Sequence, residues 1–247
     1  MFGQCKLIWT SSTTLKLIPV NGNLITINGQ VYQIPAAGIT ISNAGFAANT
    51  LYYIYAYDNA GTLTLTGNQA GHVTSTTPGN VGVEVMTGAG GDAYSLVGMA
   101  YSSSLSTFFY DRVTKWVRSW YNDSGISCSA LSGTNVSTPN TAMTLLDTNC
   151  HVYTLLWAGE MYDASFYSWC NCNTDSAAMY YQGGVNGAVI GAYDVATANS
   201  TRYSSVTNGF SDAAGADGRF EFQQFGMTSG GTVSFYNKVT TVTTTRK

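Results

Sequence analysis

Charged side chains are scarce in this sequence. Only 9% of its 247 residues are Asp, Glu, Lys or Arg, whereas about 25% is usual for a soluble domain. The net charge is -3 and the basic residues are scattered, so the chain lacks the positive patch that binding to nucleic acid requires. Ser, Thr, Asn and Gly must cover the surface instead, and we expect further copies of the chain to cover much of it.

Helical patterns and long apolar runs are also missing. No extended stretch is rich in Ala, Glu, Lys and Leu, and no apolar run reaches the roughly 20 residues that a membrane helix needs. The first residues, MFGQCKLIWTSST, have no continuous apolar core, so we expect no signal peptide and no membrane partner. Abundant tyrosine (17) and glycine (27) instead favour an all-β fold.

Patterns of catalytic residues are equally sparse. With two histidines in the chain, general-base catalysis by histidine is nearly excluded, and His72 is expected in a solvated loop. The sequence has no Ser-His-Asp order, no HExxH and no Walker loop. Glu160 and Asp163 are the best pair for cleaving a polysaccharide, but in a strand they would point to opposite faces. We therefore expect no enzyme, no catalytic residue and no cofactor, with a polysaccharide depolymerase as a remote alternative.

The cysteines do not form a recognisable framework. An odd number of them in a chain of this length does not require disulfides, and we expect buried, reduced thiols. Cys170 and Cys172 would share one face of a strand. A zinc site would need Cys150, His151, Cys170 and Cys172 to converge, and C-x-C is not a usual spacing for structural zinc. No metal site is therefore expected. The five cysteines are Cys5, Cys128, Cys150, Cys170 and Cys172.

The segment 51–66, LYYIYAYDNAGTLTLT, predicts a β-hairpin. A three-residue loop with Gly61 in the left-handed region would close on Asp58 and Thr62 and would spare Ala60 a positive φ. This register places five side chains on one apolar face that must be buried, within the module or against another subunit. They are Tyr53, Tyr55, Tyr57, Leu63 and Leu65.

Short strands separated by turn signals run through the rest of the chain. Asn28-Gly29 is a strong hairpin signal, and residues 67–80 predict a polar loop. The best domain boundary lies at residues 122–125. We expect an N-terminal antiparallel β module over 1–124 and a jelly-roll-like β-sandwich over 125–247. In the latter, a bulge at Gln223-Gln224 would bring Phe225 and Met227 to the same face as Phe222.

Residues 108–122, FFYDRVTKWVRSWYN, are dense in aromatic and β-branched residues, which favours a strand over a helix. In a strand Trp116, Arg118 and Trp120 share a face, and the arginine could stack between the two indoles. This arrangement could be a structural clamp or a platform for carbohydrate. In the C-terminal half, glycan contacts are candidates among five aromatic residues, which could equally belong to the core: Trp157, Tyr162, Trp169, Tyr180 and Tyr181.

Several motifs in a fixed order resemble a module of virion proteins from tailed bacteriophages. They cover roughly residues 4–122 and read KLIW, LKLIPVNGNLITINGQVYQIPAAGI, NTLYYIYAYDNAGTLTLT, GHVTSTTPGNVGVEV, YSLVGMAYS and VRSWYN. Such proteins are described as tail fibre, tail or other structural proteins. In that family the segment matching Arg118–Asn122 leads into a C-terminal β module. The residues after 125 resemble such a module in general style.

The resemblance implies a structural virion protein, located in the particle and partnered by copies of itself and by other capsid or tail proteins. Fibres and spikes of this kind are commonly trimers. Because the module starts almost at residue 1, we expect a short spike, a head fibre or an accessory protein rather than a long tail fibre. The alternative from another class is a receptor-binding protein that recognises host polysaccharide.

Overall fold

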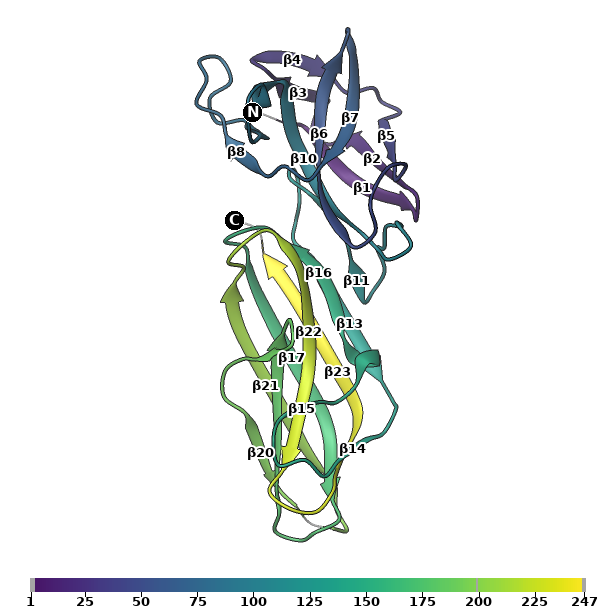
Figure 1. Cartoon of the computed structure of the whole chain (residues 1–247), viewed down its shortest axis with the longest axis vertical. Helices are drawn as coiled ribbons and strands as arrows, with labels where there is room; N and C mark the ends of the chain where they lie inside the picture. The colour runs from purple at the N-terminus through teal and green to yellow at the C-terminus, as the bar shows by residue number, and fades with distance from the viewer. Residues whose placement is uncertain (1–2, 199, 246–247) are drawn as a thin grey trace. The chain divides into compact units, whose positions relative to one another are not determined.

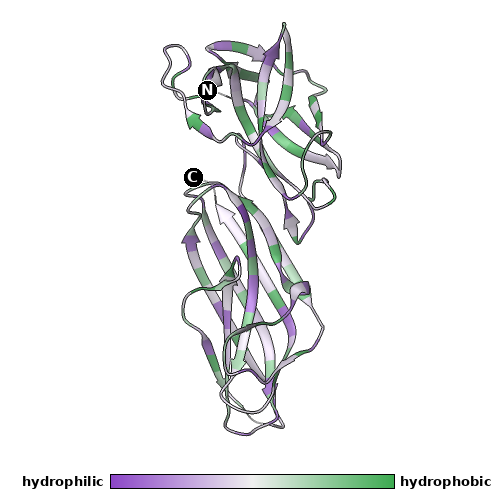
Figure 2. Ribbon diagram, in the orientation of Figure 1, coloured by the Kyte–Doolittle hydropathy of each residue, from purple (hydrophilic) through white to green (hydrophobic). Residues whose placement is uncertain are grey.

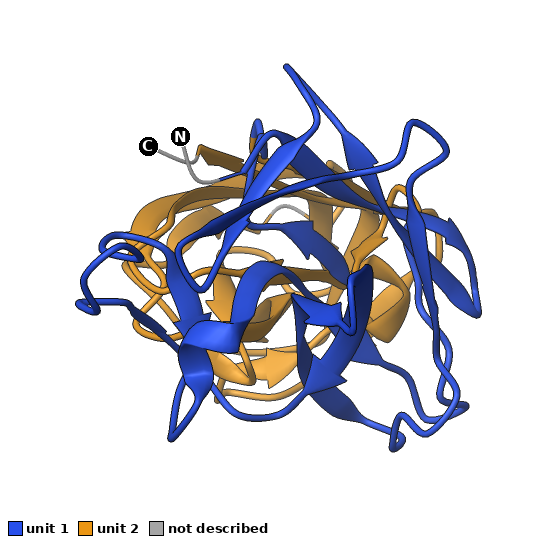
Figure 3. Ribbon diagram, turned by 90° about the horizontal axis from the view of Figure 1, so that it is seen from above, with its two compact units in different colours: residues 1–110, 116–124 blue, residues 111–115, 125–247 orange. Residues whose placement is uncertain are grey.

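The computed structural model describes residues 3–198 and 200–245, and its elements are β-strands apart from two short 3-10 turns, η1 (Gly91–Ala93) and η2 (Thr148–Cys150). The chain divides into two compact units (Figures 1 and 3). The first unit comprises Met1–Tyr110 and Trp116–Ser124, and the second Asp111–Lys115 and Gly125–Lys247. The described residues hold no helix long and apolar enough to cross a membrane.

The first unit is built from antiparallel strands in a small sheet, a larger sheet and a hairpin. The small sheet has the order β1-β2-β5, the larger one β7-β6-β10-β9-β8 with β12 on β10, and β3 pairs with β4. Their bounds are β1 (Cys5–Ser11), β2 (Thr14–Pro19), β3 (Leu24–Ile27), β4 (Gln30–Gln33), β5 (Ile39–Ser42), β6 (Thr50–Asn59), β7 (Thr62–Asn68), β8 (His72–Thr74), β9 (Glu84–Met86), β10 (Tyr94–Ser102) and β12 (Val117–Ser119).

Alternating apolar residues of these strands form one core. Leu7, Leu15 and Leu17 of the small sheet pack with Ile54 and Val97 of the larger sheet. The period of two places every second side chain inside, which is why the short apolar strands can be read from the sequence. The turn at Asn28-Gly29 also forms as expected, because Ile27 pairs with Gln30 and both turn residues have positive φ angles.

The hairpin of β6 and β7 forms, but the expected register is wrong by one residue. Asn59 pairs with Thr62, which leaves a two-residue turn of Ala60 (φ 49°) and Gly61 (φ 88°). One residue of slip moves a whole strand to the opposite face. Leu63 and Leu65 therefore share the core face with Tyr52, Ile54 and Ala56, whereas the other three tyrosines, Tyr53, Tyr55 and Tyr57, lie on the opposite face.

That opposite face is packed as well. Tyr55 is completely buried, and its hydroxyl lies 2.9 Å from the carbonyl oxygens of Ala70 and Gly71, to either of which it can donate. Tyr53 packs edge-on against His72 at 5.4 Å between ring centroids. His72 is not in a solvated loop, because it begins β8 and its Nδ1 lies 2.6 Å from Glu84 Oε1.

The polar segment before β9 is organised around one carboxylate. Asp92 accepts hydrogen bonds from Ser75 Oγ, from Thr77 Oγ1 at 2.6 Å and from Asn80 Nδ2 at 2.7 Å. These hydrogen bonds hold the pKa of Asp92 below its ordinary value of 3.8. A loop without hydrophobic periodicity is thus fixed by a hub that hydropathy does not reveal.

Residues 108–122 do not form one strand. They contain β11 (Thr114–Lys115) and β12, and the chain passes between the units within this segment. β11 pairs in parallel with β16 of the second unit, whereas β12 pairs antiparallel with β10 of the first. The N-terminal module expected over 1–124 therefore lacks residues 111–115, which lie in the second unit.

The second unit contains two sheets. The first has the order β11-β16-β22-β18-β19, with β15 on β22 and β20 on β18; the second has the order β13-β23-β17-β21, with β14 on β23. The bounds are β13 (Ser127–Ser132), β14 (Val136–Thr138), β15 (Thr144–Leu145), β16 (Val152–Leu156), β17 (Met161–Cys172), β18 (Ala178–Val185), β19 (Ala188–Val189), β20 (Asp194–Thr197), β21 (Ser204–Ala213), β22 (Gly218–Thr228) and β23 (Val233–Thr245).

The pairing of the long strands gives a jelly roll. In chain order, β13, β17, β21 and β23 belong to one sheet, with the first strand beside the last, and β16, β18, β20 and β22 belong to the other. The spatial orders β13-β23-β17-β21 and β16-β22-β18-β20 are those of two interleaved Greek keys. The sequence-based expectation of a jelly-roll-like sandwich is confirmed by these pairings.

The core of this sandwich lies between the two sheets. Phe166 and Val242 of one sheet pack in the same cluster as Met179 and Phe222 of the other. The bulge expected at Gln223-Gln224 is absent, since β22 pairs with β18 in unbroken register from Phe222 to Thr228. The polar Gln224 therefore points into the core beside Thr240, at 2.9 Å, and Phe225 lies on the other side.

A buried ion pair fixes one end of this core. Lys238 Nζ is completely buried and lies 3.2 Å from Asp147 Oδ2. It also donates to the carbonyl of Thr134, while Ser132 Oγ donates to Asp147 at 2.6 Å. Burial alone would raise the pKa of Asp147, but hydrogen bonds from Ser132 and Asn149 and the Lys238 ammonium together hold it below its ordinary value.

The cysteines are buried free thiols. Cys170 and Cys172 share the inner face of β17, as the alternation predicts. Burial raises the pKa of Cys5 and of Cys170 to about 12, which keeps these thiols protonated and unreactive. Within residues 3–198 and 200–245, no group of three or more His, Cys, Asp and Glu side chains is arranged to hold a metal ion.

Candidate functional site: an aromatic hollow on the jelly roll

The five aromatic residues considered as glycan contacts separate into two groups. Trp157, Tyr162 and Tyr181 are buried, and the ring of Tyr162 packs on Phe222 at 5.2 Å between centroids. A buried ring has no free face for a sugar, so this part of the hypothesis needs correction: Tyr162 and Tyr181 belong to the core of the sandwich, and Trp157 is buried directly after β16. The alternation of inner and outer positions in β17 and β18 accounts for Tyr162 and Tyr181.

The remaining two candidates lie on different sheets. Tyr180 is half-buried on β18 and packs edge-on against Tyr193 at 5.1 Å between centroids. Trp169 lies on the outer face of β17 and is 41% exposed. The structure therefore does not gather the five candidates into one site, and Trp169 is the one with the most accessible ring.

A bulge in β23 brings a second aromatic ring next to Trp169. Tyr167 pairs with Val239 but Trp169 pairs with Tyr236, so β23 has one extra residue at this point. Asn237, with φ 45°, occupies the bulge. The bulge reverses the parity of β23, so that Tyr236 turns outward while Phe235 remains in the core.

Trp169, Tyr203, Tyr236 and Asn237 line a shallow hollow of about 390 Å³. Tyr203 precedes β21, is 58% exposed, and packs edge-on against Tyr236 at 5.2 Å between centroids. The Tyr236 hydroxyl donates to Asn171 Oδ1 at 3.2 Å, which holds the ring in place. The hollow is thus a group of rings from β17, from β23 and from the residue before β21, with no charged group in its lining.

Sequence reasoning found only Trp169 among these four residues. Tyr236 was missed because simple alternation from Phe235 gives no sign of the bulge. A signal was nevertheless present, since Tyr236-Asn237-Lys238 interrupts an alternating strand with Asn, the residue that best tolerates the left-handed region after glycine. Tyr203 and Asn237 lie at positions that only tertiary pairing brings close to Trp169.

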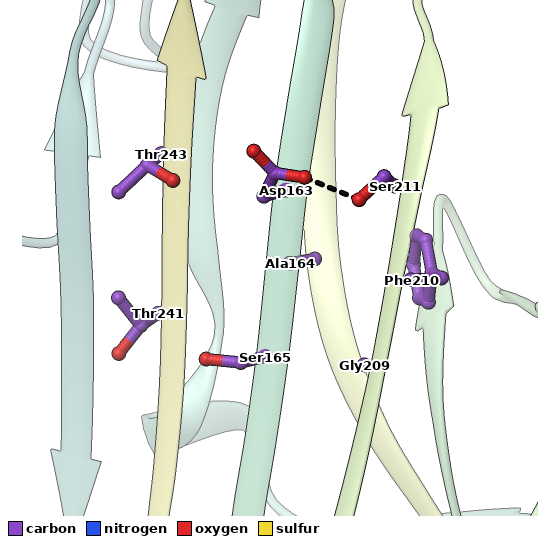
Figure 4. Close-up of a pocket in the computed structure, with 8 residues that line it drawn as sticks. All are labelled: Asp163, Ala164, Ser165, Gly209, Phe210, Ser211, Thr241 and Thr243. Carbon is purple, nitrogen blue, oxygen red and sulfur yellow. Dashed lines mark hydrogen bonds between the residues drawn. The ribbon is translucent and has the colours of Figure 1, made fainter.

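A second hollow lies on the same face. It has a volume of about 520 Å³ and runs over β17, β21 and β23, where its lining includes Ser165, Gly209 and Thr241 (Figure 4). Asp163 and Ser211 point toward each other across neighbouring strands and share a hydrogen bond. Much of this surface consists of short hydroxyl side chains, and Figure 2 shows hydrophilic and hydrophobic residues interspersed along the strands of the second unit.

The Arg118 segment of the first unit is an interior feature. Arg118 is 1% exposed and its Nε donates to Asp123 Oδ2 at 2.8 Å. Trp116 packs against Tyr101 at 5.0 Å, and Trp120 packs against His72 at 5.1 Å, both between ring centroids. A guanidinium buried on a carboxylate favours the structural interpretation of this segment over a carbohydrate platform. Its stacking between the two indoles stays a prediction.

The acidic residues considered for catalysis do not form a pair. Glu160 is buried in the turn before β17, where its Oε2 accepts the backbone N–H of Trp157 at 3.0 Å. Asp163 is exposed on the outer face of β17. The second histidine, His151, is buried with its Nδ1 2.6 Å from Glu221 Oε1. Each of these groups has a structural contact of its own: Glu160 is buried in its turn, whereas Asp163 lies on the outer face beside Ser211.

Comparison with known proteins leaves the family open. No protein-family profile matches the sequence, and no relative is found among curated proteins. The resemblance to phage virion proteins therefore rests on the motifs alone.

Similar solved structures include a TNF protein, a virus particle and a phage protein. Eiger TNF from S. frugiperda is 10% identical (TM-score 0.31; 48% of this chain and 91% of that one). A chain from the structure of the infectious bursal disease virus Gt strain is 11% identical (TM-score 0.34; 100% of this chain and 78% of that one). The enzymatically active domain of tailspike protein 4 from bacteriophage CBA120 is 13% identical (TM-score 0.19; 46% and 19%). Values this low transfer no function to this chain.

Proposed function

We propose that this protein is a structural component of a tailed-bacteriophage virion that assembles as a homo-oligomer. The observation that carries the proposal is the low charge of the outer sheet face around Ser165, where the one charged side chain of the hollow's lining, Asp163, is hydrogen-bonded to Ser211. Along β17 and β23 the outer positions include Ser165, Thr241 and Thr243. Such a surface can pack against identical copies with little desolvation of charge, which is the costly step in burying a polar surface. We propose the contact for this part of the strands and not for the aromatic hollow around Trp169.

The internal use of charge supports the same conclusion. Of the few charged groups, Arg118 and Asp123 pair with each other inside the first unit, and Lys238 and Asp147 do so inside the second. These groups therefore contribute little to the outer surface. Soluble monomers normally keep many charged side chains outside to prevent association, so the distribution here favours a chain that is covered by neighbours.

The fold is compatible with this role without requiring it. Jelly rolls occur in viral capsid proteins and in lectins, and a fold by itself does not decide function. The phage-like motifs of residues 4–122 add the particle context: a short fibre, spike or decoration subunit, in contact with capsid or tail proteins. We assign no catalytic step to the protein, since the Glu160 carboxylate accepts the backbone N–H of Trp157 within its own turn.

Two measurements test this proposal. Light scattering of the purified chain should give a multiple of its 26.3 kDa mass, with three copies as the expected number. Mass spectrometry of purified particles of the encoding phage should detect the protein at a stoichiometry comparable with that of other structural proteins. A monomer at every concentration, together with absence from the particles, contradicts the proposal.

A depolymerase remains the competing function to exclude. The test is to incubate the purified protein with capsule from the host and to follow the viscosity and the release of reducing ends. We expect no change. Loss of viscosity that disappears in the Glu160→Gln variant, but persists in Glu84→Gln, would assign an enzymatic activity and overturn this part of the proposal.

A further inference from the structure

We propose that the hollow of Trp169, Tyr203, Tyr236 and Asn237 binds a neutral saccharide. The inference concerns a site on the second unit and does not depend on the virion role: a lectin-like surface would function equally on a protein outside a particle. Its residues differ from those proposed from the sequence, because only Trp169 was among the five candidates. Tyr203, Tyr236 and Asn237 were not.

The chemistry of the lining selects the ligand. A pyranose ring presents a face of C–H groups, which pack on the electron-rich faces of aromatic rings, and an edge of hydroxyl groups. Trp169 and Tyr203 supply exposed rings. Asn237 is exposed and its amide can both donate and accept a hydrogen bond. Phosphate, sulfate or carboxylate groups would find no cationic partner in this lining.

Free hydrogen-bonding groups at the rim support the same ligand class. Neither the Trp169 indole nor the Asn237 side-chain amide hydrogen-bonds to another residue in 3–198 or 200–245. Tyr236, in contrast, is already oriented by Asn171. The hollow thus combines one fixed ring, two accessible rings and uncommitted donors, which is the pattern of a site with apolar walls and a few polar contacts.

The open shape of the hollow predicts weak binding by one copy. A volume of about 390 Å³ lies at the low end of the roughly 300–1,000 Å³ of small-molecule sites. A dissociation constant of about 1 mM is therefore expected for a disaccharide. In a homo-oligomer, several copies on one polysaccharide would raise the overall affinity through multivalency.

The experiment uses the full chain and ligand-detected saturation-transfer NMR. The probes are neutral disaccharides of glucose, galactose, mannose and N-acetylglucosamine, each titrated into the tens of millimolar. Trp169→Ala and Tyr203→Ala should each weaken binding of the responding disaccharide by about 3- to 10-fold. Trp169→Phe, which keeps a ring, should lie between wild type and Trp169→Ala.

Tyr193→Ala is the matched control. Tyr193 is 53% exposed and directly precedes β20, a strand of the other sheet of the same unit, so it reports any general effect of removing a surface tyrosine. Its affinity should stay within twofold of wild type, and all variants should melt within a few degrees of one another. The proposal is overturned if no disaccharide gives a signal, or if Trp169→Ala and Tyr203→Ala bind as wild type does. Either result would leave the particle and oligomer tests unaffected, so the two proposals fail separately.

Discussion

In the first unit, Tyr53, Tyr55 and Tyr57 lie on a sheet face that the unit's own segments cover, whereas in the second unit Trp169 and Tyr203 lie on a face open to solvent. Tyr55 is buried under the carbonyls of Ala70 and Gly71. Trp169 and Tyr203 are 41% and 58% exposed. Aromatic richness is thus a feature of both units but has different consequences: stability in the first, and an accessible surface in the second.

The difference shows how a covering loop decides the role of an aromatic strand. In the first unit the segment between β7 and β8 covers the face, since the carbonyls of Ala70 and Gly71 accept from the buried Tyr55 hydroxyl. On the outer face of the jelly roll, a bulge adds a ring without adding a covering segment. Counting tyrosines cannot distinguish the two situations, since both strands alternate in the same way.

The largest expected difference in the free energy of unfolding is between two variants that each remove one ring, one in each unit. Tyr55→Ala should lower the free energy of unfolding by about 3–5 kcal/mol, because it leaves a cavity in a packed site. Trp169→Ala should lower it by only about 1 kcal/mol, because the side chain is 41% exposed and its removal leaves no enclosed cavity. Calorimetric melting of both variants checks this contrast. Equal destabilisation would mean that the Trp169 ring is structural, and the comparison would fail.

Substitutions in the turn between β6 and β7 test whether the stability of the first unit depends on the conformation of this turn. Gly61→Val should cost about 1–2 kcal/mol, because a β-branched residue is strained at φ 88°. Ala60→Gly should instead raise the melting temperature, since Ala60 already has a positive φ. Denaturant titration measures both changes. An unaltered Gly61→Val protein would rule out this turn.

A smaller effect separates the two kinds of tyrosine hydroxyl. Tyr55→Phe should cost about 0.5–1.5 kcal/mol, because a buried hydrogen bond to the loop carbonyls is lost. Tyr203→Phe should leave the unfolding midpoint unchanged, because that side chain is exposed. The pair is compared in urea at equal protein concentration. A cost for Tyr203→Phe matching that for Tyr55→Phe would show that the Tyr203 side chain is covered in solution.

The smallest effect is the acid response of the Asp92 hub. Its pKa is lowered in the folded protein, so the carboxylate contributes stability above the ordinary value of 3.8, and that contribution is lost as the pH falls through the lowered pKa. Asp92→Asn should therefore be less stable than wild type near pH 7 and converge with it in acid. Melting curves across this range measure the gap; a gap that widens in acid contradicts the assignment.

Local patterning predicted much of the fold, and tertiary pairing decided the rest. The Asn28-Gly29 turn and the alternation in β17 followed directly from the sequence. The faces of β6 and β7 did not, because a turn of two residues instead of three reverses every partner. The pairing of Trp169 with Tyr236 was not predicted, because a single extra residue in β23 turns the Tyr236 ring outward.

The most direct measurement labels the five tryptophans with 5-fluorotryptophan and follows their fluorine resonances during titration with the disaccharide that binds best. Each resonance is assigned by Trp→Phe substitution. The account predicts that the Trp169 signal shifts and saturates, while those of Trp9, Trp116, Trp120 and Trp157 stay in place. A shift confined to Trp116 or Trp120 of the first unit, or no shift at all, would contradict the claim that recognition belongs to the outer face of the jelly roll.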